Sequence, residues 1–367
     1  MFTKKLVAIL ALTVAPVAYS QQNASTDPNL ISGTIARRFN NDTIQPVTNY
    51  RSLPTKEDLS DNERIVASDS KELFERNSSL LSFMVLYKGN VIAEHYRWPS
   101  SKSTPMFSWS MSKSLTGYTV GQSMCNNNIK SLSDTAKTYA KSLEGSSYGD
   151  TTIQNLLTMG SGVKSAAHGS TGSVRVGQWD ELYKGYNTVN AVVTEYSGRE
   201  APQGSRFAYN NTDTFALGLV LENTGGFVNQ FDKFLWKKAR PESNGYWLTD
   251  HKKVPIAAAG FSATPRDWAR MALYIVDVYK GREDTECFRE FVKDSHTTKM
   301  TSMYNGKQSY YGYQVWTHPT KSFWWAGMAG QKVGFDADKE IVLVMFASRN
   351  DYAEDLYKMF GKWRSIL

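Results

Sequence analysis

Several signatures that identify common enzyme classes are missing from this 367-residue sequence. It has no Gly-x-Ser-x-Gly elbow, no His-Glu-x-x-His pair and no phosphate-binding loop, so the usual marks of α/β-hydrolases, zinc peptidases and P-loop nucleotide hydrolases are absent. The five histidines are scattered, and no internal repeat or long low-complexity tract is present. We therefore expect chemistry that needs no metal ion and no organic cofactor.

Long hydrophobic runs are also absent once the N-terminus is passed. Residues 6–18 are apolar but too short to span a bilayer with ease, and they follow the positive pair Lys4-Lys5. Small residues in Ala18-Tyr19-Ser20 match a signal-peptidase site. We expect residues 1–20 to be a signal peptide and the mature protein to be periplasmic or secreted, with no membrane span. The alternative is an uncleaved N-terminal anchor helix.

Charge of one sign does not dominate the chain. Loss of Lys4 and Lys5 with the leader, which carries no acidic residue, lowers the formal charge from +7 to +5. No basic block is interleaved with aromatic residues, so the sequence does not indicate a nucleic-acid partner.

Cysteine is scarce, with Cys125 and Cys287 only. In an oxidising compartment these two residues can pair, but the sequence does not show whether their Cα atoms come close enough. Neither lies beside a plausible base, which disfavours a cysteine nucleophile.

The hydrophobic pattern places strands at both ends of the chain and helices between them. Strands are predicted at 81–87 and 91–96, around a Lys88-Gly89-Asn90 turn, and again at 322–327, 331–335 and 341–348. Short turns between neighbouring strands indicate antiparallel pairing. The prediction is an α+β fold, with an antiparallel β-sheet flanked by helices and an inserted all-helical subdomain. Residues 21–45 are expected to be a polar extension, and residues 46–367 one domain.

The strongest chemical signal is the segment Ser110-Met111-Ser112-Lys113. Residues three apart share one face of a helix, so the Ser110 hydroxyl and the Lys113 amine can meet. A serine becomes a good nucleophile when a base removes its proton, and burial lowers a lysine pKa enough for that task. If Ser110 begins the helix, its backbone N–H can also stabilise an oxyanion.

Five segments along the chain carry further motifs: residues 107–116 (FSWSMSKSLT), 150–162 (DTTIQNLLTMGSG), 207–211 (FAYNN), 259–267 (AGFSATPRD) and 311–313 (YGY). Together, and in this order, they resemble the serine β-lactamase and penicillin-binding protein superfamily. The similarity is to its class C-like branch, which also holds esterases and 6-aminohexanoate-dimer hydrolases. This resemblance implies a β-lactamase/transpeptidase-like fold and acyl transfer through Ser110.

Tyr209 and Asn211 match the Tyr-x-Asn motif of that branch. A phenol beside a cationic lysine loses its proton more easily, so Tyr209 can exchange a proton with Ser110 and the leaving group. Asn211 is expected to bind Lys113 or the substrate. Which of Lys113 and Tyr209 is the principal base stays open.

The third motif departs from the Lys-Thr-Gly of penicillin-recognising enzymes. The corresponding segment, Ala326-Gly327-Met328-Ala329-Gly330-Gln331, lacks the cation and the hydroxyl that bind a β-lactam carboxylate. It resembles the Gly-x-x-Gly-Gln ending of the aminohexanoate-hydrolase-like members. The backbone N–H of Met328 is expected to complete the oxyanion hole with that of Ser110. Gly327 and Gln331 are expected beside the substrate.

Further substrate contacts are assigned to Trp179 and Asp180, in a loop that overhangs the site in the family. Trp316, Trp324 and Trp325 form either a pocket wall or core. The predicted function is hydrolysis of small esters or amides through an acyl-enzyme on Ser110. Two alternatives remain: a β-lactamase or D-Ala-D-Ala peptidase, and a non-catalytic binding protein on the same fold.

Overall fold

A computed structural model describes residues 40–163, 182, 185–195, 198–304, 307–319, 321–350 and 353–367. The described strands are β1 (Asn41–Ile44), β2 (Leu80–Tyr87), β3 (Asn90–Tyr96), β4 (Met106–Phe107), β5 (Gly245–Leu248), β6 (Phe261–Ala263), β7 (Met300–Tyr304), β8 (Lys307–Tyr311), β9 (Trp316–Thr317), β10 (Phe323–Ala326), β11 (Lys332–Asp336) and β12 (Ile341–Ala347). The described α-helices are α4 (Asp61–Arg76), α5 (Met111–Cys125), α6 (Ala136–Tyr139), α7 (Ile153–Leu157), α9 (Val189–Thr194), α10 (Asn211–Asn223), α11 (Phe227–Phe231), α12 (Lys237–Ala239), α13 (Pro265–Tyr279), α14 (Glu286–Ser295) and α15 (Ala353–Ile366). Short 3-10 turns lie at Lys141–Leu143 and Met328–Gly330, and a π-helical turn at Asp232–Trp236.

The main sheet is antiparallel and is built from both ends of the chain. Its described strands run in the order β3-β2-β12-β11-β10-β9-β8-β7. Strand β2 pairs with β3 through the predicted turn and with β12 on its other side. The α+β class and the antiparallel sheet predicted from the sequence are confirmed.

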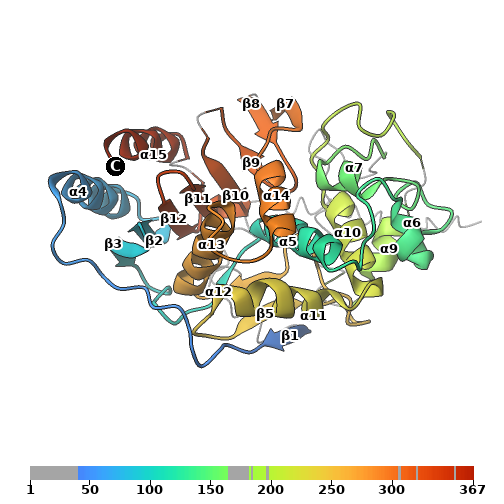
Figure 1. Cartoon of the computed structure of the whole chain (residues 1–367), viewed down its shortest axis with the longest axis horizontal. Coiled ribbons are helices and arrows are strands. Elements are labelled where there is room, and N and C mark those ends of the chain that lie inside the picture. The colour runs from blue at the N-terminus through green and yellow to red at the C-terminus, as the bar shows by residue number, and fades with distance from the viewer. Residues whose placement is uncertain are drawn as a thin grey trace, which may run out of the picture.

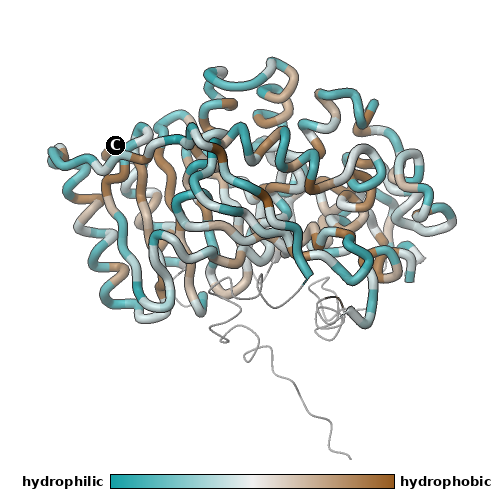
Figure 2. The backbone as a smooth tube through the Cα atoms, turned by 90° about the horizontal axis from the view of Figure 1, so that it is seen from below, coloured by the Kyte–Doolittle hydropathy of each residue, from teal (hydrophilic) through white to brown (hydrophobic). Residues whose placement is uncertain are grey.

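Both faces of this sheet are covered by helices, which explains why β12 is buried along its whole length. Side chains alternate between the faces of a strand. On β2, Phe83 and Val85 belong to the core under α4 and α15, whereas Met84 and Leu86 belong to the larger core on the opposite face. Figure 2 shows these strands as hydrophobic segments between helices whose outer faces are hydrophilic.

Helix α5 lies between the sheet and the helical part of the molecule, which holds α6, α7, α9 and α10 (Figure 1). Nearly all of its residues are buried, so it is enclosed on all sides instead of presenting one polar face. Small residues permit this close packing. A Cβ added at Gly117 would lie 2.9 Å from Cβ of Gln314, and one at Gly121 would overlap the Phe291 ring. The start of α5 is thereby fixed at the junction of the two parts.

A second, smaller sheet was not anticipated. Its order is β1-β5-β6-β4, with every described pairing antiparallel. Strand β1, residues 41–44, falls within the predicted extension 21–45 but pairs with β5. The folded unit therefore begins by Asn41, several residues before the expected boundary at 46. Residues 1–39 lie outside the described part of the chain.

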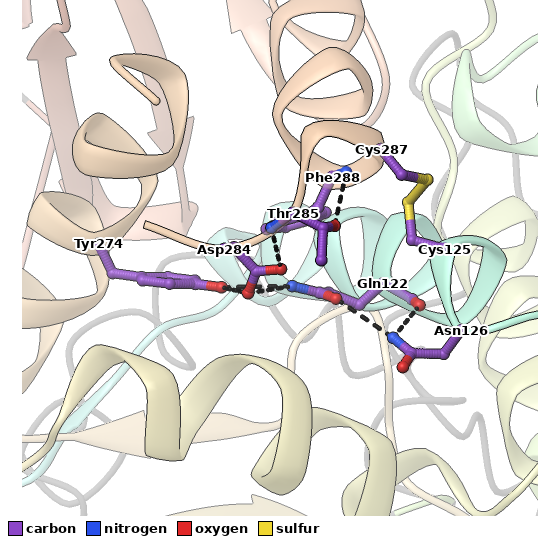
Figure 3. Close-up of a disulfide and its surroundings, with 8 residues drawn as sticks. All are labelled: Gln122, Cys125, Asn126, Tyr274, Asp284, Thr285, Cys287 and Phe288. Atoms are coloured by element: carbon purple, nitrogen blue, oxygen red, sulfur yellow. Dashed lines mark hydrogen bonds between the residues drawn. A yellow bond between two sulfur atoms is a disulfide. The ribbon is translucent and has the colours of Figure 1, made fainter. Parts of the chain in front are cut away.

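The two cysteines form a disulfide that joins the end of α5 to the start of α14. The Cα atoms of Cys125 and Cys287 are 5.8 Å apart. Figure 3 shows the polar contacts beside it: Gln122 donates to Tyr274 Oη at 3.2 Å and to an Asp284 carboxylate oxygen at 3.0 Å. The end of the helix remote from Ser110 is thus held by a covalent bond and by hydrogen bonds.

Among the described residues, no helix has the length and apolar character needed to cross a bilayer.

Candidate active site

The predicted nucleophile lies at a tight turn between β4 and α5. Ser110 is the N-cap of the helix, and Trp109 before it has φ of 48°, which side chains other than glycine seldom adopt. The turn is fixed from behind: Ser112 Oγ and Ser108 Oγ are 2.6 Å apart, and the Phe261 N–H donates to Ser112 Oγ at 3.0 Å. Such strain persists only where the surroundings impose it, and it is typical of functional sites.

The Lys113 amine lies against the Ser110 hydroxyl, as the three-residue spacing predicts. Its Nζ is 3.0 Å from Ser110 Oγ, 2.6 Å from Asn211 Oδ1 and 3.0 Å from the carbonyl oxygen of Ala258. The side chain is 1% exposed. One buried amine therefore connects the turn at α5, the start of α10 and the segment before β6.

Burial has a direct chemical consequence for Lys113. Loss of solvation disfavours the ammonium form and lowers the pKa of this lysine to about 7. No carboxylate is among the described hydrogen-bond partners of its Nζ. The amine is therefore available in its neutral form near neutral pH.

Tyr209 lies over the same amine, with Lys113 Nζ 5.1 Å from its ring centroid. Other aromatic rings surround it: the centroid distances from Tyr209 are 5.3 Å to Trp316, 6.2 Å to Tyr311 and 6.3 Å to Phe207. The structure thus brings Ser110, Lys113, Tyr209 and Asn211 together, and adds an aromatic wall beside them.

The Gly327 segment approaches the nucleophile turn closely. A Cβ at Gly327 would lie 2.2 Å from the carbonyl oxygen of Ser108 and 3.2 Å from Cβ of Trp109, so only glycine fits. The backbone of Met328 is therefore held close to the Ser110 turn, while its side chain is 48% exposed. This close approach is enough to explain why residue 327 is a glycine, and the explanation needs no contact between Gly327 and a substrate.

Gln331 has a different role from the one predicted. Its side chain is fully buried, and its amide exchanges two hydrogen bonds of 2.9 Å with the backbone of Ala347 on β12. Because both ends of the amide are occupied, Gln331 fixes the Gly327 turn to the sheet instead of contacting a substrate. Trp179 and Asp180 lie outside the described residues.

The three tryptophans separate into one wall residue and two core residues. Trp316 faces Tyr209. Trp325 is fully buried and donates to Tyr118 Oη at 3.2 Å, and Trp324 packs against Phe360 of α15.

Two contributors to the site were missed in the sequence. Ala258 acts through its main-chain oxygen, for which no residue type gives a signal. Asp213, two residues after Asn211, is fully buried and accepts a 2.6 Å hydrogen bond from Ser161 Oγ. Its position in the first turn of a helix resembles an ordinary helix-start acid, so the sequence pattern did not distinguish it.

The α+β architecture is that of the β-lactamase/transpeptidase-like fold, and comparison with known families agrees. The chain belongs to the β-lactamase family, whose sequence model matches residues 71–365. This places it in the serine β-lactamase and penicillin-binding protein superfamily, as the resemblance implied. A search of curated proteins finds no match.

Solved structures share the fold at low sequence identity. A proposed 6-aminohexanoate-dimer hydrolase from Bacillus anthracis is 22% identical, with a TM-score of 0.74 over 94% of this chain and 97% of that one. A β-lactamase/D-alanine carboxypeptidase from Pseudomonas syringae is 15% identical (TM-score 0.64; 83% and 99% covered). EstCE1, a hydrolase with promiscuous acyltransferase activity, is 14% identical (TM-score 0.62; 80% and 96% covered). At these identities the comparison shows the fold and leaves the substrate open.

Proposed function

We propose that this protein is an exported serine hydrolase that cleaves small esters or amides through an acyl-enzyme on Ser110. The observation that carries the proposal is the 3.0 Å contact between Ser110 Oγ and the buried Lys113 amine. A pure binding protein has no need for a desolvated lysine against a serine at a strained turn.

Lys113 is assigned as the base that activates Ser110. A neutral amine has two N–H groups and one lone pair, and the oxygens of Asn211 and Ala258 accept the two N–H groups. The lone pair then faces the Ser110 hydroxyl. Ser110 Oγ attacks the substrate carbonyl carbon while its proton moves to Lys113. Tyr209, over the same amine, is assigned to pass that proton to the departing alcohol or amine.

The oxyanion is assigned to two backbone donors, the N–H groups of Ser110 and Met328. The first N–H groups of a helix have no partner within the helix, so the Ser110 N–H at the start of α5 can serve. Water then attacks the carbonyl carbon of the ester that joins the acyl group to Ser110. This step releases the acyl group as a carboxylic acid and restores the Ser110 hydroxyl.

The favoured substrates are uncharged near the reacting carbonyl, including linear amide oligomers. The segment Ala326–Gln331, which corresponds to the motif that supplies a cation and a hydroxyl in penicillin-recognising enzymes, holds neither a cationic nor a hydroxyl side chain. Phe207 and Trp316 are partly buried and place apolar surface beside Tyr209. These features disfavour a carboxylate-bearing β-lactam or D-Ala-D-Ala peptide.

Export to the periplasm or the cell exterior is part of the proposal. The Cys125–Cys287 disulfide supports it, because disulfides persist in oxidising compartments and are rare in the cytosol.

The test combines fluorophosphonate labelling with hydrolysis of p-nitrophenyl esters. Wild type is expected to label and to turn over esters, and Ser110→Ala to do neither. Ser114→Ala, on the same helix but with a hydroxyl that donates to the Gln314 carbonyl oxygen, is expected to label still and serves as the matched control. Full activity of Ser110→Ala would disprove the nucleophile. Cephalosporin turnover as fast as ester turnover would favour the β-lactamase alternative.

A further inference from the structure

A buried acid behind the site has no role in the proposed reaction. Asp213 is the third residue of α10, two positions beyond Asn211, and it is fully buried. No ion pair involving it occurs among the described residues. Burial disfavours its charged form, so the contacts of its carboxyl group are defined by the hydrogen bonds that it accepts and not by an ion pair.

The contacts of Asp213 converge on the Tyr209–Asn211 segment. Its Oδ1 accepts from Asn210 Nδ2 at 2.9 Å, and its backbone N–H donates to Asn210 Oδ1 at 2.7 Å. The Asn210 side chain is therefore held at both ends by one residue. Asn210 lies between Tyr209 and Asn211, the two residues that face the Lys113 amine.

The same carboxylate also holds the loop after α7. Oδ1 accepts from Ser161 Oγ at 2.6 Å, and Oδ2 accepts from the Ser161 N–H at 3.3 Å. On the other side of Ser161, the Arg199 guanidinium donates to its carbonyl oxygen and to that of Ser147. Asp213 thus joins the Tyr209 segment to a loop that is itself braced by Arg199.

A second aspartate shows what an ordinary residue at this helix position looks like. Asp267 is also the third residue of its helix, α13, and also fully buried. It is paired with Arg270 at 2.8 Å and accepts from the backbone N–H groups of Glu242 and Ser243. Asp267 forms a direct ion pair, whereas Asp213 is held by hydrogen bonds from Asn210 and Ser161, and the Arg199 charge acts on it without an ion pair.

We propose that Asp213 is a positioning residue, which fixes Tyr209 and Asn211 against Lys113 by clamping Asn210 to the Ser161 loop. The inference rests on the proposed function for its effect on rate, but the clamp itself is a property of the fold. Asp213→Asn keeps the size of the side chain and one acceptor. The substitution replaces Oδ2 by an NH2 group. That group is a donor, so it cannot accept the hydrogen bond from the Ser161 N–H.

The kinetic test measures the rate constant for fluorophosphonate labelling of Ser110 in the full chain. Asp213→Asn is expected to lower it at least tenfold, with kcat for ester hydrolysis falling and KM changing less than threefold. Asp267→Asn is expected to stay within threefold of wild type. In an Asn211→Ala background the Asp213→Asn effect is expected to shrink below threefold, since both changes then affect the same contact. Equal losses in the two backgrounds, or an unimpaired Asp213→Asn, would overturn the inference.

A readout independent of activity keeps the two proposals separable. Amide hydrogen exchange of residues 208–214 is expected to accelerate at least tenfold in Asp213→Asn and to be unchanged in Asp267→Asn. If wild type neither labels nor hydrolyses any ester, the proposed function fails while the exchange result still decides the clamp. Unchanged exchange in Asp213→Asn would refute the clamp whatever the activity.

Discussion

The pH dependence of acylation is the sharpest consequence of the buried Lys113. Its pKa falls from 10.5 to about 7 because the ammonium ion is removed from water. At pH 7 about half of the molecules then hold a neutral amine, against roughly one in three thousand for an ordinary lysine. This fall in pKa corresponds to about 5 kcal/mol of free energy, by which the neutral amine is favoured over the ammonium ion relative to an ordinary lysine.

The rate constant of acylation should therefore rise with pH and level off above an apparent pKa near 7. The sign follows from the chemistry, since the neutral amine takes the proton and the ammonium form has no lone pair. The assay is the stopped-flow burst of p-nitrophenol, recorded at its isosbestic wavelength because its own ionisation falls in the same range. Hydrolysis by Ser110→Ala is subtracted as background.

Lys113→Met is the matching perturbation, because methionine has a similar length and can be buried without a charge. Loss of a general base predicts a fall of about 10²–10⁴-fold in acylation, with no remaining titration near pH 7. Asp213, whose pKa burial raises to about 7, titrates in the same range. The titration should persist in Asp213→Asn if it belongs to Lys113. A flat profile between pH 5.5 and 9 in wild type, or a tenth of the activity retained by Lys113→Met, would refute the reasoning.

Three further changes test other parts of the structure. Replacing Cys125 and Cys287 by serine should destabilise the protein by about 2–4 kcal/mol, seen as a lower Tm that reductant no longer affects. Trp316→Ala should raise KM for long-chain or aryl esters about tenfold, and change it little for an acetyl ester, in a substrate series. Gly327→Ala should reduce kcat at least a hundredfold, because its Cβ would lie 2.2 Å from the Ser108 oxygen; unchanged turnover would show that the turn yields easily.

The parts of the fold that follow from the sequence are those fixed by local rules. The β2–β3 hairpin, predicted at 81–87 and 91–96, lies at residues 80–87 and 90–96, because alternation and a Gly-containing turn determine it locally. The Ser110–Lys113 contact follows from helical spacing in the same way.

The parts that did not follow depend on contacts between distant segments. The small sheet consists of strands of two to four residues, too short to carry a hydrophobic period. Pairing of Cys125 with Cys287 needs the packing of α5 against α14. Gln331 was assigned to the substrate from a motif, yet its partner Ala347 is a backbone site at the end of β12, for which no residue type gives a signal.

The pairing of β2 with β12 has a consequence for how the chain reaches its native state. These adjacent strands of the main sheet are the segments Leu80–Tyr87 and Ile341–Ala347, so nearly the whole chain must be synthesised before they meet. Contacts between residues so far apart in sequence slow folding, because a long loop must close first. The main sheet of such a chain stays incomplete until β12 has been synthesised, which is compatible with the export proposed above.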